Sequence, residues 1–336
     1  MKAVHLTAAS LKAFAFVDLP EPEAPERGRI LVRMKTASFN FLDIAVANGA
    51  YPGAIYPNVP VADGAGEVIA VGEEVWQVAV GDRVAVHPKA YWIAGASTAH
   101  TASAMRGVNL RGSLVEIAEL DAASVVPIPD HLSFEQGATL PIASTTSWNA
   151  MDKAGIGPGS TVVLLGTGGV SLFALQHAKA RGARVVVTSS ADDKLEDAMK
   201  LGADEGVNYR KTPAWNDVVR DLTNGIGADL VLETVGGESL PRSVAAVRQG
   251  GLVYLIGFLG GTQASVDLLA LIGRAITIRG ANTGSVADLA HAARAMVDHR
   301  IEPVIARIES VREIGAAYAR FAEGGHFGKV AITLDW

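Results

Sequence analysis

One segment of the chain joins an apolar run, a glycine-rich turn and a helical pattern without interruption. The run Val162–Leu165 is typical of a strand buried on both faces of a parallel sheet. Glycines follow it directly, and Val170, Phe173, Ala174 and His177 then recur at the spacing of a helix. The start of such a helix offers free N–H groups and a positive dipole end to phosphate. The segment therefore predicts a dinucleotide-binding site.

The glycines of this turn have different roles in the prediction. Gly166 allows the sharp turn after the strand, and Gly168 leaves room where a pyrophosphate must approach. Ser171 stands where the full fingerprint has its third glycine, and a second predicted strand, Arg184–Val187, follows at the expected distance. The residues expected to bind the phosphates are Gly166, Thr167, Gly168, Gly169 and Val170.

The end of the second predicted strand indicates which nucleotide is bound. NAD sites usually place an Asp or Glu there, and this chain has Thr188, Ser189 and Ser190 instead. Small hydroxyls leave room for a 2′-phosphate, while Lys194 adds a charge and Tyr209 a further hydroxyl. We therefore expect NADP(H), bound in part by Ser189, Ser190, Lys194 and Tyr209.

Two aspartates argue mildly against this choice. Either Asp192 or Asp193 could reach a ribose hydroxyl. Their alternative role is to cap the N-terminus of the helix that carries Lys194.

Composition narrows the remaining possibilities. With 336 residues, 49% hydrophobic and 19% charged, the chain is long and apolar enough for two domains. A net charge of −6 without a basic run makes nucleic acid an unexpected partner. The absence of cysteine excludes disulfides, thiolate nucleophiles and cysteine-bound zinc. The N-terminal MKAVHLTAAS has no signal-peptide pattern and no long apolar stretch follows, so we expect a cytoplasmic protein that does not enter a membrane.

The predicted pattern of secondary structure changes along the chain. Short β-like runs at Ile30–Lys35, Gly66–Val71 and Asp82–His87, separated by prolines and glycines, predict an antiparallel, barrel-like domain. From about Ser133 helical and strand patterns alternate, which predicts a doubly wound α/β sheet. Its expected elements are strands at Val162–Leu165, Val185–Val187, Leu230–Leu232 and Leu252–Ile256, with helices after Gly169 and Asp192. A last helix, Val286–His299, and strands at Pro303–Ile308 and Lys329–Leu334 suggest a return to the first domain.

Six motifs occur in the order of a known family. They are SFNFLDIAVANGAYP, VADGAGEVIAVGEEVWQVAVGDRVA, IPDHLSFEQGATLP, LGTGGVSLFALQHAKARGARVVVTSS, LGADEGVNYR and GHFGKVAI. The sequence resembles the medium-chain dehydrogenase/reductase superfamily, and within it the zinc-independent quinone-oxidoreductase and enoyl-reductase branch. The resemblance covers nearly the whole chain. It implies an α/β protein with a GroES-like antiparallel β-barrel catalytic domain (1–125), a Rossmann domain (126–262), and a segment (263–336) that ends the Rossmann sheet and returns to the catalytic domain.

The chain departs from the zinc alcohol dehydrogenases of that family. Those enzymes have a catalytic cysteine in the segment matching Ser38–Asp43 and a Gly-His-Glu motif in the region of Asp63, whereas neither a cysteine nor a histidine stands there in this chain. Lys89–Ser113 is a small-residue loop in place of their four-cysteine lobe. We therefore expect no metal site, and His87, His100 and His131 are expected to be solvated or packed histidines.

Chemistry without a Lewis acid favours one class of substrate. An unactivated alcohol is hard to deprotonate without a metal. An enone, enal or quinone spreads the incoming charge onto its own oxygen, which a few hydrogen-bond donors can stabilise. The expected activity is NADPH-dependent reduction of an activated C=C bond or a quinone. The alternatives are a zinc-free alcohol dehydrogenase or carbonyl reductase, and a non-catalytic NADPH-binding protein.

By resemblance, two residues are catalytic candidates. Asn40 could hydrogen-bond both the nicotinamide and a substrate carbonyl, and its alternative is a local Asx-turn. Tyr51 could polarise the oxygen or pass a proton, and its alternative is packing beside a proline turn. Asp43 is expected to be a partner within its loop, and Asp63 is expected to cap the turn before Gly64 and Gly66.

The resemblance also extends the cofactor site and suggests an assembly. The further residues expected at the ribose and nicotinamide are Thr145, Val235, Gly236, Gly257 and Phe258. Trp148 is either part of that pocket or core. The apolar segment Val266–Gly280 is expected to form an edge strand that pairs with its copy, which predicts a homodimer.

Overall fold

The structure, a computed structural model, describes Met1–Trp336 and divides into two units. Unit 1 consists of Met1–Thr145 and Gly284–Trp336, and unit 2 of Thr146–Thr283. The first boundary, between Thr145 and Thr146, lies later than the expected 125/126, and the second, between Thr283 and Gly284, falls within 263–336, the segment expected to end the Rossmann sheet and return to the catalytic domain. The first boundary is shifted because helix α3 (Phe134–Ala138) packs on the sheet of unit 1, although its sequence already has the texture of the helical half.

Unit 2 is built on a six-stranded parallel sheet in the order β10-β9-β8-β11-β12-β13. The strands are β8 (Thr161–Leu165), β9 (Arg184–Ser189), β10 (Glu205–Asn208), β11 (Ala228–Glu233), β12 (Val247–Leu255) and β13 (Thr277–Gly280). The apolar run of β8 is buried throughout, as its sequence requires. The strand order reverses direction between β8 and β11, where an open α/β sheet binds its ligand at the carboxyl ends.

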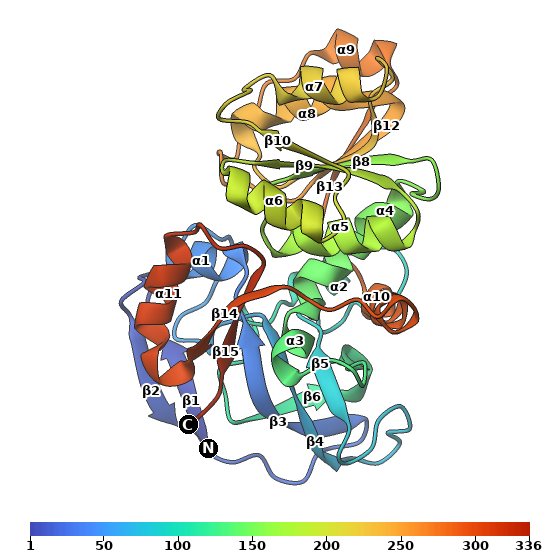
Figure 1. Ribbon diagram of the computed structural model, residues 1–336. Coiled ribbons are helices and arrows are strands. Elements are labelled where there is room, and N and C mark those ends of the chain that lie inside the picture. The colour runs from blue at the N-terminus through green and yellow to red at the C-terminus, as the bar shows by residue number, and fades with distance from the viewer. The chain divides into compact units, whose positions relative to one another are not determined.

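Helices cover both faces of this sheet. Helices α5 (Gly169–Ala180) and α6 (Asp192–Lys200) lie on one face, and α7 (Trp215–Leu222) and α8 (Leu240–Ala246) on the other (Figure 1). The remaining helices are α4 (Thr145–Lys153), which begins at the unit boundary, and α9 (Leu268–Gly273). Trp148 of α4 meets the His177 ring edge-on at 5.4 Å, and the Arg181 guanidinium lies 4.1 Å above its ring centre. Trp148 therefore has a packing role.

Unit 1 is largely antiparallel. Its main sheet has the order β14-β15-β3-β4-β5-β7, and β6 also pairs with β3. The strands are β3 (Arg29–Ser38), β4 (Asp63–Val71), β5 (Arg83–Val86), β6 (Ile117–Asp121), β7 (Val125–Pro127), β14 (Ile305–Ser310) and β15 (Lys329–Thr333), beside a separate ribbon of β1 (Lys2–Leu6) and β2 (Phe14–Asp18). The helices are α1 (Phe41–Ala47), α2 (Ala99–Ser103), α3, α10 (Val286–His299) and α11 (Ile314–Ala322).

The C-terminal return to the first domain is confirmed. β15, drawn in red, runs beside the blue β3 and pairs with it antiparallel, Ile332 opposite Ala37 (Figure 1). This pairing brings the segment at Lys329 next to the end of β3 and the start of α1. None of the helices combines the length and apolar character needed to cross a membrane.

Candidate functional site

The glycine-rich turn after β8 has the predicted strand–turn–helix geometry. Gly166 adopts a φ of +75°, which glycine reaches without strain, and its amide donates to the Thr188 carbonyl at 2.9 Å. Gly168 caps α5, which begins at Gly169. A Cβ built on Gly166 or Gly168 would meet no atom within 4 Å, so the space beside the helix N-terminus is open. Backbone N–H groups and open space together fit a phosphate group.

Ser171 explains the missing third glycine of the fingerprint. Its side chain is buried in the first turn of α5, and its hydroxyl donates to the Leu165 carbonyl at 2.9 Å. The Thr234 hydroxyl of the loop after β11 donates to the same carbonyl at 2.7 Å. The Ser171 hydrogen bond thus holds α5 to β8 at the position where the third glycine of the fingerprint would allow close packing of helix and strand.

The ends of β9 and β10 bring together Ser189 and Tyr209, two of the residues predicted for the 2′-phosphate. Asn208 pairs with Ser189 in the sheet, and the Tyr209 amide donates to the Ser189 carbonyl at 3.0 Å. Ser190 follows Ser189 directly, and Lys194 is the third residue of α6.

The two aspartates are not the N-cap, contrary to the alternative weighed above. Ala191 is the N-cap residue of α6, and Asp192 is the first helical residue. Asp192 accepts a hydrogen bond from Asn208 at 2.7 Å and pairs with Lys211, and these bonds lower its pKa. The Asp193 carboxylate accepts from the Lys194 amide at 2.8 Å.

A buried carboxylate organises the loop after β11. The Glu233 Oε1 atom accepts from the amides of Val235 (2.8 Å) and Gly236 (2.9 Å). Its Oε2 atom accepts from the hydroxyls of Ser239 (2.9 Å) and Ser243 (2.5 Å). Glu233 was not identified from the sequence as a functional residue. The available signal was an acidic residue at the end of the apolar run Leu230–Leu232, shortly before the pair Gly236–Gly237.

The glycines predicted at these strand ends are required by a close approach of two loops. Gly236 has a φ of +74°, and a Cβ on it would lie 2.7 Å from the Gly257 carbonyl. A Cβ on Gly257 would lie 1.7 Å from the Thr234 carbonyl oxygen. Val235 and Phe258 flank these glycines. The loops after β11 and β12 thus bring all four predicted residues together.

In unit 1, Thr145 has a polar atom without a partner. The residue is fully buried as the first residue of α4, and its hydroxyl makes no hydrogen bond. A buried hydroxyl of this kind is unusual unless a bound group satisfies it. The unsatisfied hydroxyl therefore marks Thr145 as a residue that could bind such a group.

Asn40 lies in a buried polar network that links β3, β4 and β15. Its Nδ2 donates to Asp63 Oδ2 at 2.8 Å, and its Oδ1 accepts from Lys329 Nζ at 2.7 Å. The amide therefore joins separate segments, and Asn40 is also the N-cap of α1, where it forms a capping box with Asp43. The Lys329 Nζ atom also donates to the Phe39 carbonyl at 2.6 Å and lies 3.7 Å from Asp63 Oδ2.

The carboxylates of this network are buried, and one has a free oxygen. Asp43 accepts from the amides of Asn40 (2.7 Å) and Ala62 (3.1 Å), so it is the loop partner that was predicted. Asp63 Oδ2 accepts weakly from the Ile142 amide at 3.3 Å, while its Oδ1 has no partner. Asp63 thus belongs to the network and is not a turn cap.

Burial dominates the ionisation of these groups. It raises the pKa of Asp43 to about 7 and that of Asp63 to about 6, against the opposing effect of the Lys329 ammonium. Burial lowers the pKa of Lys329, and the two carboxylates oppose that change. Burial thus favours the neutral form of each group, while the attraction between Lys329 and the two carboxylates favours the charged forms.

Tyr51 lies beyond the opposite end of α1 from Asn40. Its amide donates to the Ala45 carbonyl at 3.1 Å, and its ring packs against the core of unit 1. Burial raises the pKa of its phenol, which keeps the hydroxyl protonated as a donor at neutral pH. This packing accords with the structural alternative, and the catalytic role stays a prediction.

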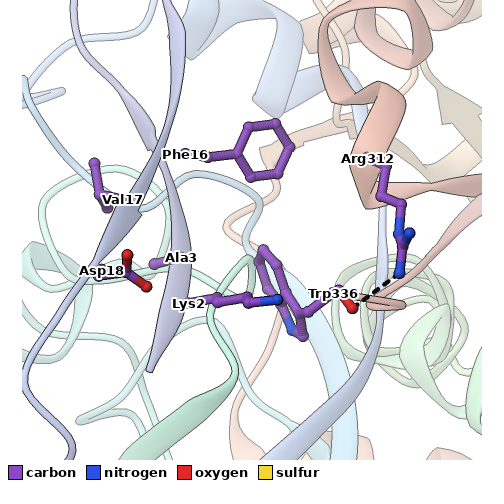
Figure 2. A pocket seen from close by; sticks show the side chains of 7 residues that line it. All are labelled: Lys2, Ala3, Phe16, Val17, Asp18, Arg312 and Trp336. Carbon is purple, nitrogen blue, oxygen red and sulfur yellow. Dashed lines mark hydrogen bonds between the residues drawn. The ribbon is translucent and has the colours of Figure 1, made fainter.

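A separate groove of about 360 Å³ lies near the two ends of the chain. Its lining includes Lys2, Phe16, Arg312 and Trp336, and the Arg312 guanidinium donates to the Trp336 carbonyl at 2.9 Å (Figure 2). None of the residues predicted for the cofactor or for catalysis lines this groove.

Comparison with known proteins finds matches along most of the chain. Residues 26–130 match a family model described as an alcohol dehydrogenase GroES-like domain, and residues 169–298 match one described as a zinc-binding dehydrogenase. A zinc-type alcohol dehydrogenase-like protein of Schizosaccharomyces pombe is 37% identical over 326 residues, covering 94% of each chain.

Solved structures agree with these matches. A protein from Sinorhizobium meliloti 1021 has a TM-score of 0.92 at 35% identity, covering 99% of this chain and 98% of that one. A structure described as an NAD-dependent alcohol dehydrogenase has a TM-score of 0.87 at 31% identity, covering 99% of each chain.

The residues of this chain do not fit the zinc that two of these descriptions mention. The chain has no cysteine, and the structure holds no group of three His, Asp or Glu side chains that could share a metal ion. The buried carboxylates Asp43 and Asp63 lie near Asn40, but the Lys329 ammonium, 3.7 Å from Asp63 Oδ2, would repel a metal cation there.

Proposed function

Because this chain belongs to the medium-chain dehydrogenase/reductase superfamily, whose GroES-like and Rossmann-type folds it has, we propose that it is an NADPH-dependent, zinc-independent reductase of activated C=C bonds or quinones. Membership of the family already makes the chain an oxidoreductase of the alcohol dehydrogenase family with a nicotinamide cofactor. Substrate class, cofactor preference and independence from zinc are the proposal.

In this proposal, residues of unit 2 hold the cofactor. The backbone N–H groups at Gly168 and Gly169 would face the pyrophosphate, and the loop held by Glu233 would border the ribose and nicotinamide. The bound NADPH supplies a hydride to the substrate. The chain then has to stabilise the negative charge that develops on the substrate oxygen.

Asn40 carries the proposal for the chemical step. Its Nδ2 has two N–H groups, and the hydrogen bond to Asp63 uses one of them. The other is available to donate to a substrate oxygen. A carbonyl or quinone oxygen conjugated to the reacting carbon needs such donors and no Lewis acid, which supports the reduction of an activated double bond.

The preference for NADPH is supported by the groups at the ends of β9 and β10. Ser189, Ser190 and Tyr209 adjoin there, and Lys194 follows in α6. Asp192 is held by Asn208 and Lys211, so its carboxylate is engaged and Lys211 adds a further cation to this edge. The cations Lys194 and Lys211, with Asp192 already engaged, suit a charged 2′-phosphate better than an uncharged ribose hydroxyl.

A second candidate is a zinc-free NADP-dependent alcohol dehydrogenase or carbonyl reductase. It is favoured by the names of the relatives, which are described as alcohol dehydrogenases. The same donors at Asn40 could serve a ketone, because the carbonyl oxygen gains the charge in both reactions.

We also propose a homodimer formed at the edge of the sheet in unit 2. β13 pairs only with β12, and its other edge is open. Leu268, Leu269 and Ile272 of the preceding helix α9 are each at least two-thirds exposed. A free sheet edge beside exposed leucines is what pairing with a second copy would cover.

One assay tests the proposal. NADPH oxidation is followed against quinones, enones, enals, enoyl thioesters, simple ketones and, in reverse, alcohols, each with and without a chelator. Turnover of an enone or quinone that a chelator leaves unchanged supports it. Turnover confined to ketones and alcohols favours the second candidate, and NADPH binding without any turnover favours a non-catalytic protein.

A further inference from the structure

We infer that Lys329 is a positioning residue that fixes the orientation of the Asn40 amide and strengthens its free N–H as a donor. Lys329 belongs to the motif GHFGKVAI, and no role is assigned to it above. The inference rests on the proposed function, because it concerns how Asn40 stabilises the charge on a substrate oxygen.

The geometry leaves the amide only one favourable orientation. The amide oxygen faces an ammonium at 2.7 Å, and the amide nitrogen faces a carboxylate at 2.8 Å. Turning the amide over would place its NH₂ group against the ammonium and its oxygen against the carboxylate. Both contacts would become repulsive, so the two charged neighbours hold the N–H that remains free in a single direction.

The ammonium also changes the strength of that N–H. A hydrogen bond from a cation to the amide oxygen draws electron density from the whole amide group, which makes the nitrogen a better donor. Water does not weaken this effect, because Lys329 and Asp63 are 3% and 0% exposed. The cation of this network thus acts on the substrate oxygen through Asn40.

A purely structural role would give a different result. A buried ion pair can hold β15 against β4 without affecting any reaction, and breaking it commonly costs stability. The groups that face this pair are Asp43 of α1, beside it, and Tyr318 of α11, whose hydroxyl is buried next to Asp43. A structural role therefore predicts lower stability, with kcat unchanged in the protein that folds.

The test compares single and double variants. Lys329→Met removes the cation but leaves Asp63 unpaired in the interior, which lowers the stability of that variant. Lys329→Met combined with Asp63→Asn removes both charges and keeps an acceptor for Asn40. Lys329→Arg keeps the charge, and Lys35→Met is the control, since its ion pair with Glu67 on the same sheet is more than a third exposed.

For the double variant we expect kcat on the best activated substrate to fall roughly tenfold to a hundredfold, as for the loss of one oxyanion donor's strength. NADPH affinity, measured by fluorescence, should stay within about twofold of the parent. Lys329→Arg should recover part of the loss, and Lys35→Met should leave kcat unchanged. A double variant with the parent's kcat would overturn the inference.

A second measurement does not depend on turnover. In protein labelled with ¹⁵N at asparagine, the side-chain amide of Asn40, identified through Asn40→Ala, should give one fixed pair of proton signals that moves in the double variant. Signals that stay in place would overturn the inference. If the parent reduces no activated substrate, the proposed function fails, and this spectrum still decides whether Lys329 controls the amide.

Discussion

Replacement of Glu233 tests whether one buried carboxylate holds the loop that borders the predicted nicotinamide site. The carboxylate accepts four hydrogen bonds, two from the amides of Val235 and Gly236 and two from the hydroxyls of Ser239 and Ser243. The hydroxyls can rotate to new partners, whereas the two amides are fixed by the backbone. The amides are therefore the groups that suffer when the acceptor is removed.

The expected loss in free energy of unfolding follows from this difference between the fixed amides and the rotatable hydroxyls. In Glu233→Ala two buried amides lose their acceptor, at roughly 1–3 kcal/mol each, while relief of the buried charge returns part of that cost. We expect the free energy of unfolding to fall by about 2–4 kcal/mol. In Glu233→Gln one oxygen still accepts from both amides, and the new NH₂ group can donate to the serine hydroxyls. That variant should lose only about 1 kcal/mol.

Urea unfolding followed by circular dichroism measures the stabilities, and fluorescence titration measures the NADPH dissociation constant. The constant should rise about tenfold in Glu233→Ala and less in Glu233→Gln, because the loop is expected to touch the cofactor. The control is Glu238→Ala, an exposed glutamate of the same loop. If Glu233→Ala unfolds at the same urea concentration as this control, the carboxylate does not hold the loop and the reasoning is refuted.

Four further predictions concern the cofactor, the assembly, the catalytic candidates and the buried acids. NADPH should bind more tightly than NADH, and Lys194→Ala should narrow that gap, since one phosphate-paired charge contributes roughly 1.5–3 kcal/mol; equal affinities in the parent would contradict this. The protein should be a dimer at micromolar concentration by light scattering, and Leu269→Asp should shift it toward monomer; a monomeric parent would refute the dimer. Tyr51→Phe should lower kcat about tenfold to a thousandfold at unchanged NADPH affinity, and an unchanged kcat would return Tyr51 to its packing role. Because burial raises the pKa of Asp43 to about 7, the native state binds a proton that the unfolded state releases between about pH 4 and 7, so this group's contribution to stability declines as pH rises through that range. The stability difference between the parent and Asp43→Asn should therefore change by about 3 kcal/mol from pH 4.5 to 8, and a constant difference would show that Asp43 does not titrate there.

The sequence predicted those parts of the fold in which a periodic pattern is long enough to be distinctive. Helix α10 occupies the expected range Val286–His299, and β8 and α5 follow each other as the glycine-rich segment indicated. Short elements such as β10 and α9 lacked such a pattern, since their few residues pair or pack only when the rest of unit 2 is in place. The domain boundary was displaced for a similar reason, because α3 looks like part of the helical half and packs on the other sheet.

The phosphate-binding turn and the Asn40 network likewise differed in how far the sequence could predict them. The phosphate-binding turn lies in one continuous segment, and its function depends on backbone groups, so the positions of glycines were enough to predict it. The Asn40 network depends on side chains that are far apart in sequence: Asp63 is 23 residues from Asn40, and Lys329 is 289 residues away. Nothing local to Asn40 indicates a lysine on its oxygen, and an Asx-turn was therefore an equally reasonable expectation.

This difference bears on the proposed chemistry, which uses no metal. A metal site needs several ligands that converge on one ion, and that requirement leaves recognisable residue types in the sequence. An amide held between an ammonium and a carboxylate needs only one lysine, one aspartate and one asparagine, which are common residues. What makes them effective is the pairing of β15 with β3 and of β3 with β4, which brings Lys329 and Asp63 to opposite ends of one amide group. The chemistry proposed here is thus set by strand register: a shift of β15 by one residue would turn the side chain of Lys329 to the other face of the sheet and leave Asn40 without the cation on its oxygen.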